Sequence, residues 1–159
     1  MDASARKGFS FGLTSSIITA MGLMVGLYSG TGSQLAVIGG IVSIAIADSL
    51  SDALGIHISE ESEKKNTAKH VWKSTYTTFL TKLVSTSTFL VPILLLDLTS
   101  AIIAGAVWGI LLLSILSYFI AKERRESAAM VIAEHVGIAI AVVVLTYFVG
   151  GWVASAFGT

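Results

Sequence analysis

The sequence predicts an all-α, polytopic membrane protein with five transmembrane helices. Of its 159 residues 54% are hydrophobic and only 13% are charged, and the mean hydropathy is +0.84. Water-soluble domains carry about 25% charged residues, so this composition places the chain in a bilayer. Five apolar stretches of about 20 residues follow one another, and each is long enough to cross a hydrocarbon core of about 30 Å.

The five predicted spans are 9–28, 35–58, 75–96, 99–121 and 127–150. Arg6 and Lys7 precede the first span as in a signal peptide, but no small-x-small cleavage site follows its long apolar run, so we expect a retained helix. The longest connection, 59–74, is a charged loop or helix extension too short to form a domain. Residues 1–159 are therefore expected to form one transmembrane domain.

The distribution of basic residues predicts how the chain threads the membrane. Lys and Arg occur in the N-terminal tail, in or just after the second connection, and in the fourth connection, whereas the first and third connections and the C-terminus have none. The positive-inside rule therefore predicts a cytosolic N-terminus and a C-terminus outside. The short connections favour a prokaryotic cell membrane.

Composition also excludes several classes of function. The formal net charge of +0 argues against nucleic acid as a partner. Because the chain has no cysteine, it can form no disulfide and no thiolate metal site. His-Glu-x-x-His and Gly-x-Ser-x-Gly motifs are absent from the sequence, so we expect neither an enzyme nor a bound cofactor.

Asp48 and Asp52 are the most informative residues. They are four residues apart in the apolar second span, so their carboxylates point to the same side of a helix. An ionised carboxylate at the centre of a bilayer costs about 3 kcal/mol or more, and such residues usually face a bundle interior, a partner charge or a translocated ion.

Counting about 1.5 Å per residue, every span places a polar residue about 10 Å from the cytosolic boundary. These residues are Ser15, Ser16, Asp48, Lys82, Ser114 and Glu134, with Asp52 and His57 nearer the cytosol. Carboxylates suit hard divalent cations, and imidazole from His57 or His135 biases the choice toward Mn²⁺ or Fe²⁺. Glu134 and His135 are adjacent and splay by about 100°, so we expect Glu134 rather than His135 to be the ligand.

The sequence therefore indicates a transport pathway for divalent cations. Its candidate metal ligands are Asp48, Asp52, Glu134, His135 and His57, and its candidate path or coupling residues are Ser15, Ser16 and Lys82. Displacement or deprotonation of Lys82 by an arriving metal would couple metal to proton movement. Alternatively, Lys82 pairs with Asp48 or Glu134, and the chain is a non-transporting assembly or regulatory protein with a structural ion-pair network.

Small residues and methionines in the spans have a simpler interpretation. Gly22, Gly26 and Gly30, and likewise Gly105 and Gly109, follow small-xxx-small spacing, which predicts close helix packing or, alternatively, dimerisation. For Met21 and Met24 we expect packing rather than metal ligation. The charged run 60–65 is expected to extend the second helix as a solvated end.

Two segments resemble the vacuolar iron transporter family. They are 11–19, Phe-Gly-Leu-Thr-Ser-Ser-Ile-Ile-Thr, and 47–59, Ala-Asp-Ser-Leu-Ser-Asp-Ala-Leu-Gly-Ile-His-Ile-Ser. The family typically carries Phe-Gly-Leu-Asn-Asp-Gly in its first helix and Ala-Gly-Ala-x-Ser-Met-Ala-Leu-Gly-Glu-Tyr-x-Ser in its second. The likeness covers most of the chain as five helices with one proline, Pro92. It implies a homodimer that exports Fe²⁺ or Mn²⁺ from the cytosol in exchange for protons, along a path between the subunits.

The chain departs from the family pattern at the residues that matter for mechanism. Ser15 stands where the family has its metal-binding Asp, Asp52 replaces the second-helix Met, and Asp48 replaces a Gly. Ile56 and His57 stand in place of the Glu and Tyr. The connection 59–74 is too short for the glutamate-rich domain of many members. The resemblance thus implies a ligand set moved from the first helix to the second, with the metal and the proton coupling left open.

Overall fold

The protein is built from five long helices and one short helix. The computed structural model describes residues 2–158, in which the helices are α1 (Ala3–Thr31), α2 (Gln34–Ser62), α3 (Ala68–Thr88), α4 (Leu90–Leu95), α5 (Leu98–Arg124) and α6 (Ala128–Phe157). With α3 and α4 taken together as Ala68–Leu95, five segments are long and apolar enough to cross a membrane. The predicted all-α class with five candidate spans is confirmed.

Four of the long helices, α1, α2, α3 and α5, begin before their predicted spans because their N-cap residues lie outside the apolar stretches. Asp2, Ser33, Thr67 and Asp97 each precede a helix and accept a hydrogen bond from the backbone N–H three residues later. Gly32 ends α1 with a φ of 57°, a left-handed conformation that glycine adopts without strain. The connection predicted at 59–74 shrinks to residues 63–67 between α2 and α3.

The third span is broken near its lone proline. Pro92 has no N–H and cannot bond the carbonyl of Thr88, so the helix does not continue regularly, and α4 begins at Leu90. Residues of neighbouring helices form hydrogen bonds on both sides of the break. The Trp108 indole N–H of α5 donates to the Thr88 hydroxyl at 3.0 Å, and the Gln34 amide of α2 donates to the Ile93 carbonyl. The third span is therefore a kinked unit held by α2 and α5.

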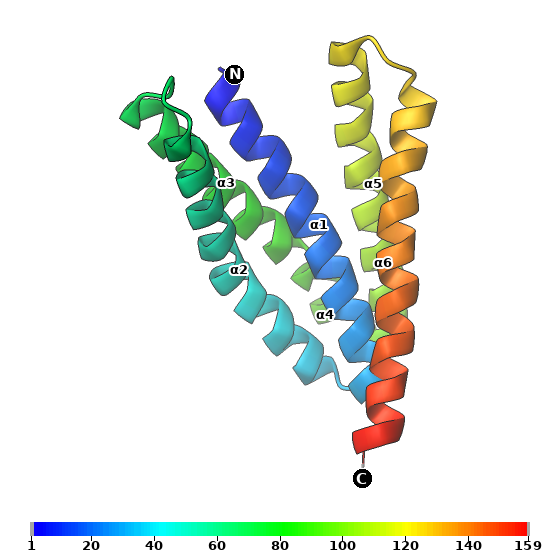
Figure 1. Ribbon diagram of the computed structural model, residues 1–159. Helices are drawn as coiled ribbons and strands as arrows, with labels where there is room; N and C mark the ends of the chain where they lie inside the picture. The colour runs from blue at the N-terminus through cyan, green and yellow to red at the C-terminus, as the bar shows by residue number, and fades with distance from the viewer. Residues whose placement is uncertain (1, 159) are drawn as a thin grey trace.

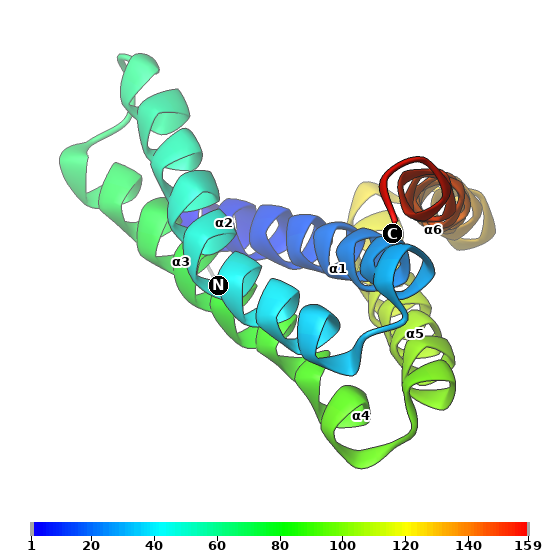
Figure 2. The same ribbon diagram turned by 90° about the horizontal axis from the view of Figure 1, so that it is seen from below.

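Helix α1 lies at the centre of the bundle and packs against α2, α3, α5 and α6. In Figure 1 the group of α1, α2 and α3 and the pair of α5 and α6 meet beside the C-terminal half of α1 and diverge toward its N-terminus. The view from below in Figure 2 places α2 and α3 on one side of α1 and α5 and α6 on the other. The N-terminus, the α2–α3 connection and the α5–α6 connection share one end of the bundle, which carries all the basic residues except Lys82.

Small residues allow the close contacts between these groups. A Cβ on Gly150 of α6 would lie 2.2 Å from the carbonyl oxygen of Gly26 in α1, so the two backbones touch. On the opposite side of α1, the buried side chains of Met21 and Met24 fill the space over the two glycines of α5. The predicted packing role is confirmed for the glycines of α1 and α5 and for both methionines.

We predict that Gly150→Ala destabilises the α1–α6 contact by about 1–3 kcal/mol, because the added methyl group overpacks a backbone-to-backbone approach. Gly137→Ala on the same helix is the matched control, since a Cβ there meets nothing within 4 Å and Ala is favoured over Gly in a helix by about 1 kcal/mol. Unfolding in mixed micelles measures both. Equal stability of the two variants would contradict the packing described.

The start of α1 should be sensitive to acid. Asp2 accepts the Ala5 N–H at 3.0 Å and pairs with Lys73 of α3, and these contacts lower its pKa to about 2, Lys73 being the larger cause. A lowered pKa means that the carboxylate stabilises the fold above pH 4 and that this contribution is lost as the pH falls toward 2. The protection factor of the first-turn amides, which compares the measured exchange rate with the intrinsic rate at the same pH, should therefore fall over this window. Asp2→Asn should show the lower protection factor already at pH 6, and a wild-type protection factor that does not change between pH 4 and 2 would contradict the assignment.

Candidate functional site

The ammonium of Lys82 sits at the centre of a polar cluster between α1, α2 and α3. Its side chain is only 1% exposed, and its Nζ lies 2.6 Å from Asp48 Oδ2 and in contact with Asp52 Oδ2. It also donates to Ser15 Oγ at 2.8 Å, and Ser15 in turn donates to Asp52 Oδ2 at 2.6 Å. Two carboxylates and a hydroxyl thus enclose one buried cation, and we name these four residues the Lys82 cluster.

Local sequence explains how three helices deliver these groups to one point. The four-residue spacing puts both aspartates on the same side of α2, as predicted. A Cβ on Gly12 of α1 would come within 2.9 Å of the Thr78 carbonyl oxygen in α3, so the backbones of α1 and α3 approach closely one turn before Ser15. The long side chain of Lys82 then reaches across from α3 to α2.

The two aspartates of the Lys82 cluster remain partly exposed. The side chains of Asp48 and Asp52 are 29% and 21% exposed. Beside them runs an exposed or half-exposed stripe of small residues at every fourth position, composed of Gly39, Ser43, Ala47, Ser51, Gly55 and Ser59. Small side chains let another helix approach closely, so the carboxylates lie within reach of a neighbour packed on this stripe.

The structure joins three helices at the cluster, not all five. Glu134 is exposed on α6, a helix that packs on α1 and α5, and it forms no ion pair with any of residues 2–158. The imidazole of His135 lies 2.8 Å from Ser117 of α5. Because the Ser117 hydroxyl donates to the Leu113 carbonyl, it accepts from His135 Nδ1. Of the two pairings considered as the alternative for Lys82, the one with Asp48 is formed, whereas Glu134 and His135 lie outside the Lys82 cluster.

The remaining predicted residues make separate contacts. Ser16 bonds to Ser85 of α3 at 2.9 Å, and Ser114 donates to the Ile110 carbonyl of its own helix. His57 Nδ1 lies 3.0 Å from the Thr75 hydroxyl, and its ring packs against an aromatic residue of α3. Among residues 2–158, no group of three or more His, Cys, Asp and Glu side chains is placed to hold a metal ion.

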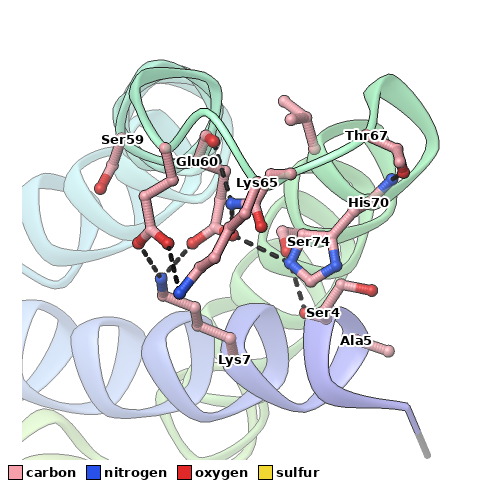
Figure 3. A network of polar contacts seen from close by, with 12 residues as sticks. Ser4, Ala5, Lys7, Ser59, Glu60, Lys65, Thr67, His70 and Ser74 are labelled. Atoms are coloured by element: carbon pink, nitrogen blue, oxygen red, sulfur yellow. Dashed lines mark hydrogen bonds and ion pairs between the residues drawn. The ribbon is translucent and has the colours of Figure 1, made fainter.

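A second ionic cluster was missed by sequence reasoning. Glu60 is only 1% exposed, although the run 60–65 was expected to be solvated, and that expectation is wrong for this residue. Its carboxylate contacts the Lys7 ammonium of α1, and it accepts from Asn66 and from His70 of α3, both at 3.0 Å (Figure 3). Glu60 follows Asp52 by eight residues, which places it on the same helix face. That periodicity was the available signal.

No protein-family model matches the chain, and no curated protein is similar to it. The likeness to the vacuolar iron transporter family therefore rests on segments 11–19 and 47–59 and on the plan of five helices with one proline.

We predict that Lys82→Met destabilises the protein by about 3–5 kcal/mol, because it leaves two carboxylates without their cation inside the bundle. Adding Asp48→Asn and Asp52→Asn to Lys82→Met should recover most of that loss, since no charge then remains to be compensated. Unfolding of the single and triple variants in the same detergent measures the difference. A triple variant no more stable than Lys82→Met would show that the cluster is not held together by charge.

Proposed function

We propose that this protein is a transmembrane transporter of divalent cations in which the Lys82 ammonium occupies the cation position when no cargo is bound. The supporting observation is the enclosure of a buried ammonium by oxygens of Ser15, Asp48 and Asp52. These are hard oxygen donors, which Mn²⁺, Fe²⁺, Mg²⁺ and Ca²⁺ also prefer. A cargo ion and the ammonium therefore compete for the same place.

The charges of the cluster suggest how a proton would be coupled to the ion. Two carboxylates and one ammonium carry a formal charge of −1. If a divalent cation takes the position and Lys82 loses its proton, two negative charges balance two positive ones. Each ion bound would then release one proton, and the return of a proton to Lys82 would expel the ion.

The cargo and the assembly follow from the ligand count and from the resemblance. The resemblance favours Fe²⁺ or Mn²⁺ and a homodimer, and divalent cations take about six ligands, more than one chain offers. A second copy packed on the small-residue stripe of α2 would add its own Asp48 and Asp52 and cover their exposed sides. The basic end of the bundle faces the cytosol by the positive-inside rule, which makes export across a cell membrane the proposed direction.

One observation favours a different function. Lys82 already contacts both aspartates, so the cluster also suits a non-transporting assembly or regulatory protein whose ion pairs fix the register of the helices. In that case the wild-type protein would carry no metal flux, and Asp52→Asn would alter only stability or oligomeric state.

Flux into proteoliposomes tests the proposal. Mn²⁺, Fe²⁺, Co²⁺, Zn²⁺ and Ca²⁺ are offered in turn, with and without a pH gradient, to vesicles that contain a metal-sensitive dye. We expect saturable flux of Mn²⁺ or Fe²⁺ that an opposing proton gradient accelerates, and a loss of about tenfold or more in Asp48→Asn and in Asp52→Asn, because even outer-shell changes at metal sites cost about 10–100-fold.

Two controls separate the site from the fold. Ser114→Ala should leave flux unchanged, because its hydroxyl bonds only to its own helix, and Glu134→Gln tests the carboxylate of α6. Gel filtration must show the same oligomer for every variant compared. No flux of any of the five ions in the wild-type protein, together with an altered oligomer in Asp52→Asn, would support the assembly function instead.

A further inference from the structure

Helix α2 carries two similar ionic layers, one above the other. In the Lys82 cluster an ammonium lies between Asp48 and Asp52. Nearer the cytosolic end, the Lys7 ammonium contacts Glu60 Oε1 and lies 3.7 Å from Glu63 Oε1. In each layer, one lysine from a neighbouring helix faces two carboxylates. In the second layer these belong to Glu60 of α2 and to Glu63, which directly follows α2.

The second layer joins the cytosolic ends of three helices. Lys7 comes from α1, Glu60 from α2 and His70 from α3, and Asn66 in the connection donates both to the Glu60 carboxylate and to its backbone carbonyl. Figure 3 shows Lys7 and His70 converging on Glu60. The Glu60 carboxylate itself is buried, and its contacts with residues of α1, α3 and the connection hold the three helix ends together.

The two layers are separated by about 12 Å along α2, since Glu60 follows Asp52 by eight residues. Between them, on the same face, lies Ile56, which is buried and apolar. An ion moving from the cytosol along the inner face of α2 would therefore meet the Glu60 layer first, the apolar side chain of Ile56 next, and Asp52 last.

We propose that the Glu60 network of Lys7, Glu60, Asn66 and His70 is the cytosolic gate of the Lys82 cluster; this inference rests on the proposed function. In the closed state the network joins α1, α2 and α3 and keeps Ile56 packed between the layers. Opening breaks the contact between Lys7 and Glu60 and gives water a route to Asp52 from the cytosolic end, along the face of α2 that packs against α1 and α3.

The surroundings of Lys7 allow its contact with Glu60 to break and re-form. Its side chain is 47% exposed, whereas Glu60 is buried. Lys7 also has a second acceptor at 3.7 Å in Glu63, which is itself partly exposed and paired with Lys65. The Lys7 ammonium can therefore move from Glu60 to Glu63 and still contact a carboxylate. A cation arriving from the cytosol would then meet the Glu60 oxygens that Lys7 has left.

Thiol accessibility tests the gate directly, because the chain has no cysteine of its own. Ser49 is buried beside Asp48, and its hydroxyl has no hydrogen-bond partner within residues 2–158, so Ser49→Cys is a mild substitution. Labelling by a membrane-impermeant thiol reagent added to the cytosolic side should be slow in Ser49→Cys alone. It should become several-fold faster when Glu60→Gln or Lys7→Met is added.

Matched controls define the result. Glu61→Gln, which neutralises the exposed neighbour of Glu60, should leave the labelling rate unchanged. The exchanged pair Lys7→Glu with Glu60→Lys should restore slow labelling. If Glu60→Gln does not fold, the labelling rate of Lys7→Met alone tests the gate. Lys7 is half exposed at the surface, so its replacement is expected to leave the fold intact.

An unchanged labelling rate in folded Lys7→Met or Glu60→Gln, with only a lower melting temperature, would overturn the gate and leave the network as a structural clamp. The labelling rate does not depend on metal flux. A failed flux assay with accelerated labelling would therefore count against the proposed cargo and not against the gate, and the reverse result would count against the gate alone.

Discussion

The architecture depends on the need to neutralise charges inside an apolar bundle. The Lys82 ammonium is sealed from solvent, and an unpaired ion at such a depth costs several kcal/mol. Its partners come from two other helices, Ser15 from α1 and the aspartates from α2, so the register of α1, α2 and α3 relative to one another is set by this requirement. The close approach of α1 and α3 at Gly12 is the packing that permits it. By contrast, α5 and α6 supply apolar surface and meet α1 through glycines and methionines.

The same requirement recurs at the end of the bundle that holds the N-terminus and the α2–α3 connection, where Glu60 of α2 is buried against Lys7. Both ionic layers lie on the face of α2 that is directed at α1 and α3, and each takes its lysine from a different helix: Lys82 from α3 and Lys7 from α1. The layers differ in their exposure, because the Lys82 ammonium is enclosed whereas Lys7 reaches water. Because of this difference we propose different roles for the two layers. The enclosed Lys82 cluster holds the cation position, and the Glu60 network controls access to it.

Local sequence patterns predicted much of this structure. The predictions that were wrong concern side chains whose direction depends on how each helix is rotated about its own axis. The spans follow from apolar length, and the pairing of Asp48 with Asp52 on one side follows from spacing. Counting residues along a span gives the depth of a side chain in the membrane but not the direction in which it points. For that reason the count grouped Glu134 with the residues of the Lys82 cluster, although Glu134 lies exposed on α6. The burial of Glu60 was missed because charged runs at helix ends are usually solvated. Its contacts with Lys7, Asn66 and His70 come from outside α2 and cannot be read from the run itself.

The number of acidic residues in the Lys82 cluster bears on which function the geometry favours. A purely structural ion pair is complete with one carboxylate for one ammonium, and a second carboxylate leaves a formal charge of −1 among membrane-spanning helices. Such a surplus charge costs about 3 kcal/mol at a bilayer centre on insertion scales, and Ser15 donates only one hydrogen bond toward offsetting it. Partial exposure of both aspartates beside the small-residue stripe reduces that cost only if water, a cation or a second subunit occupies the space. An extra carboxylate that is open on one side therefore suits a site through which positive charge passes better than it suits a fixed helix clamp.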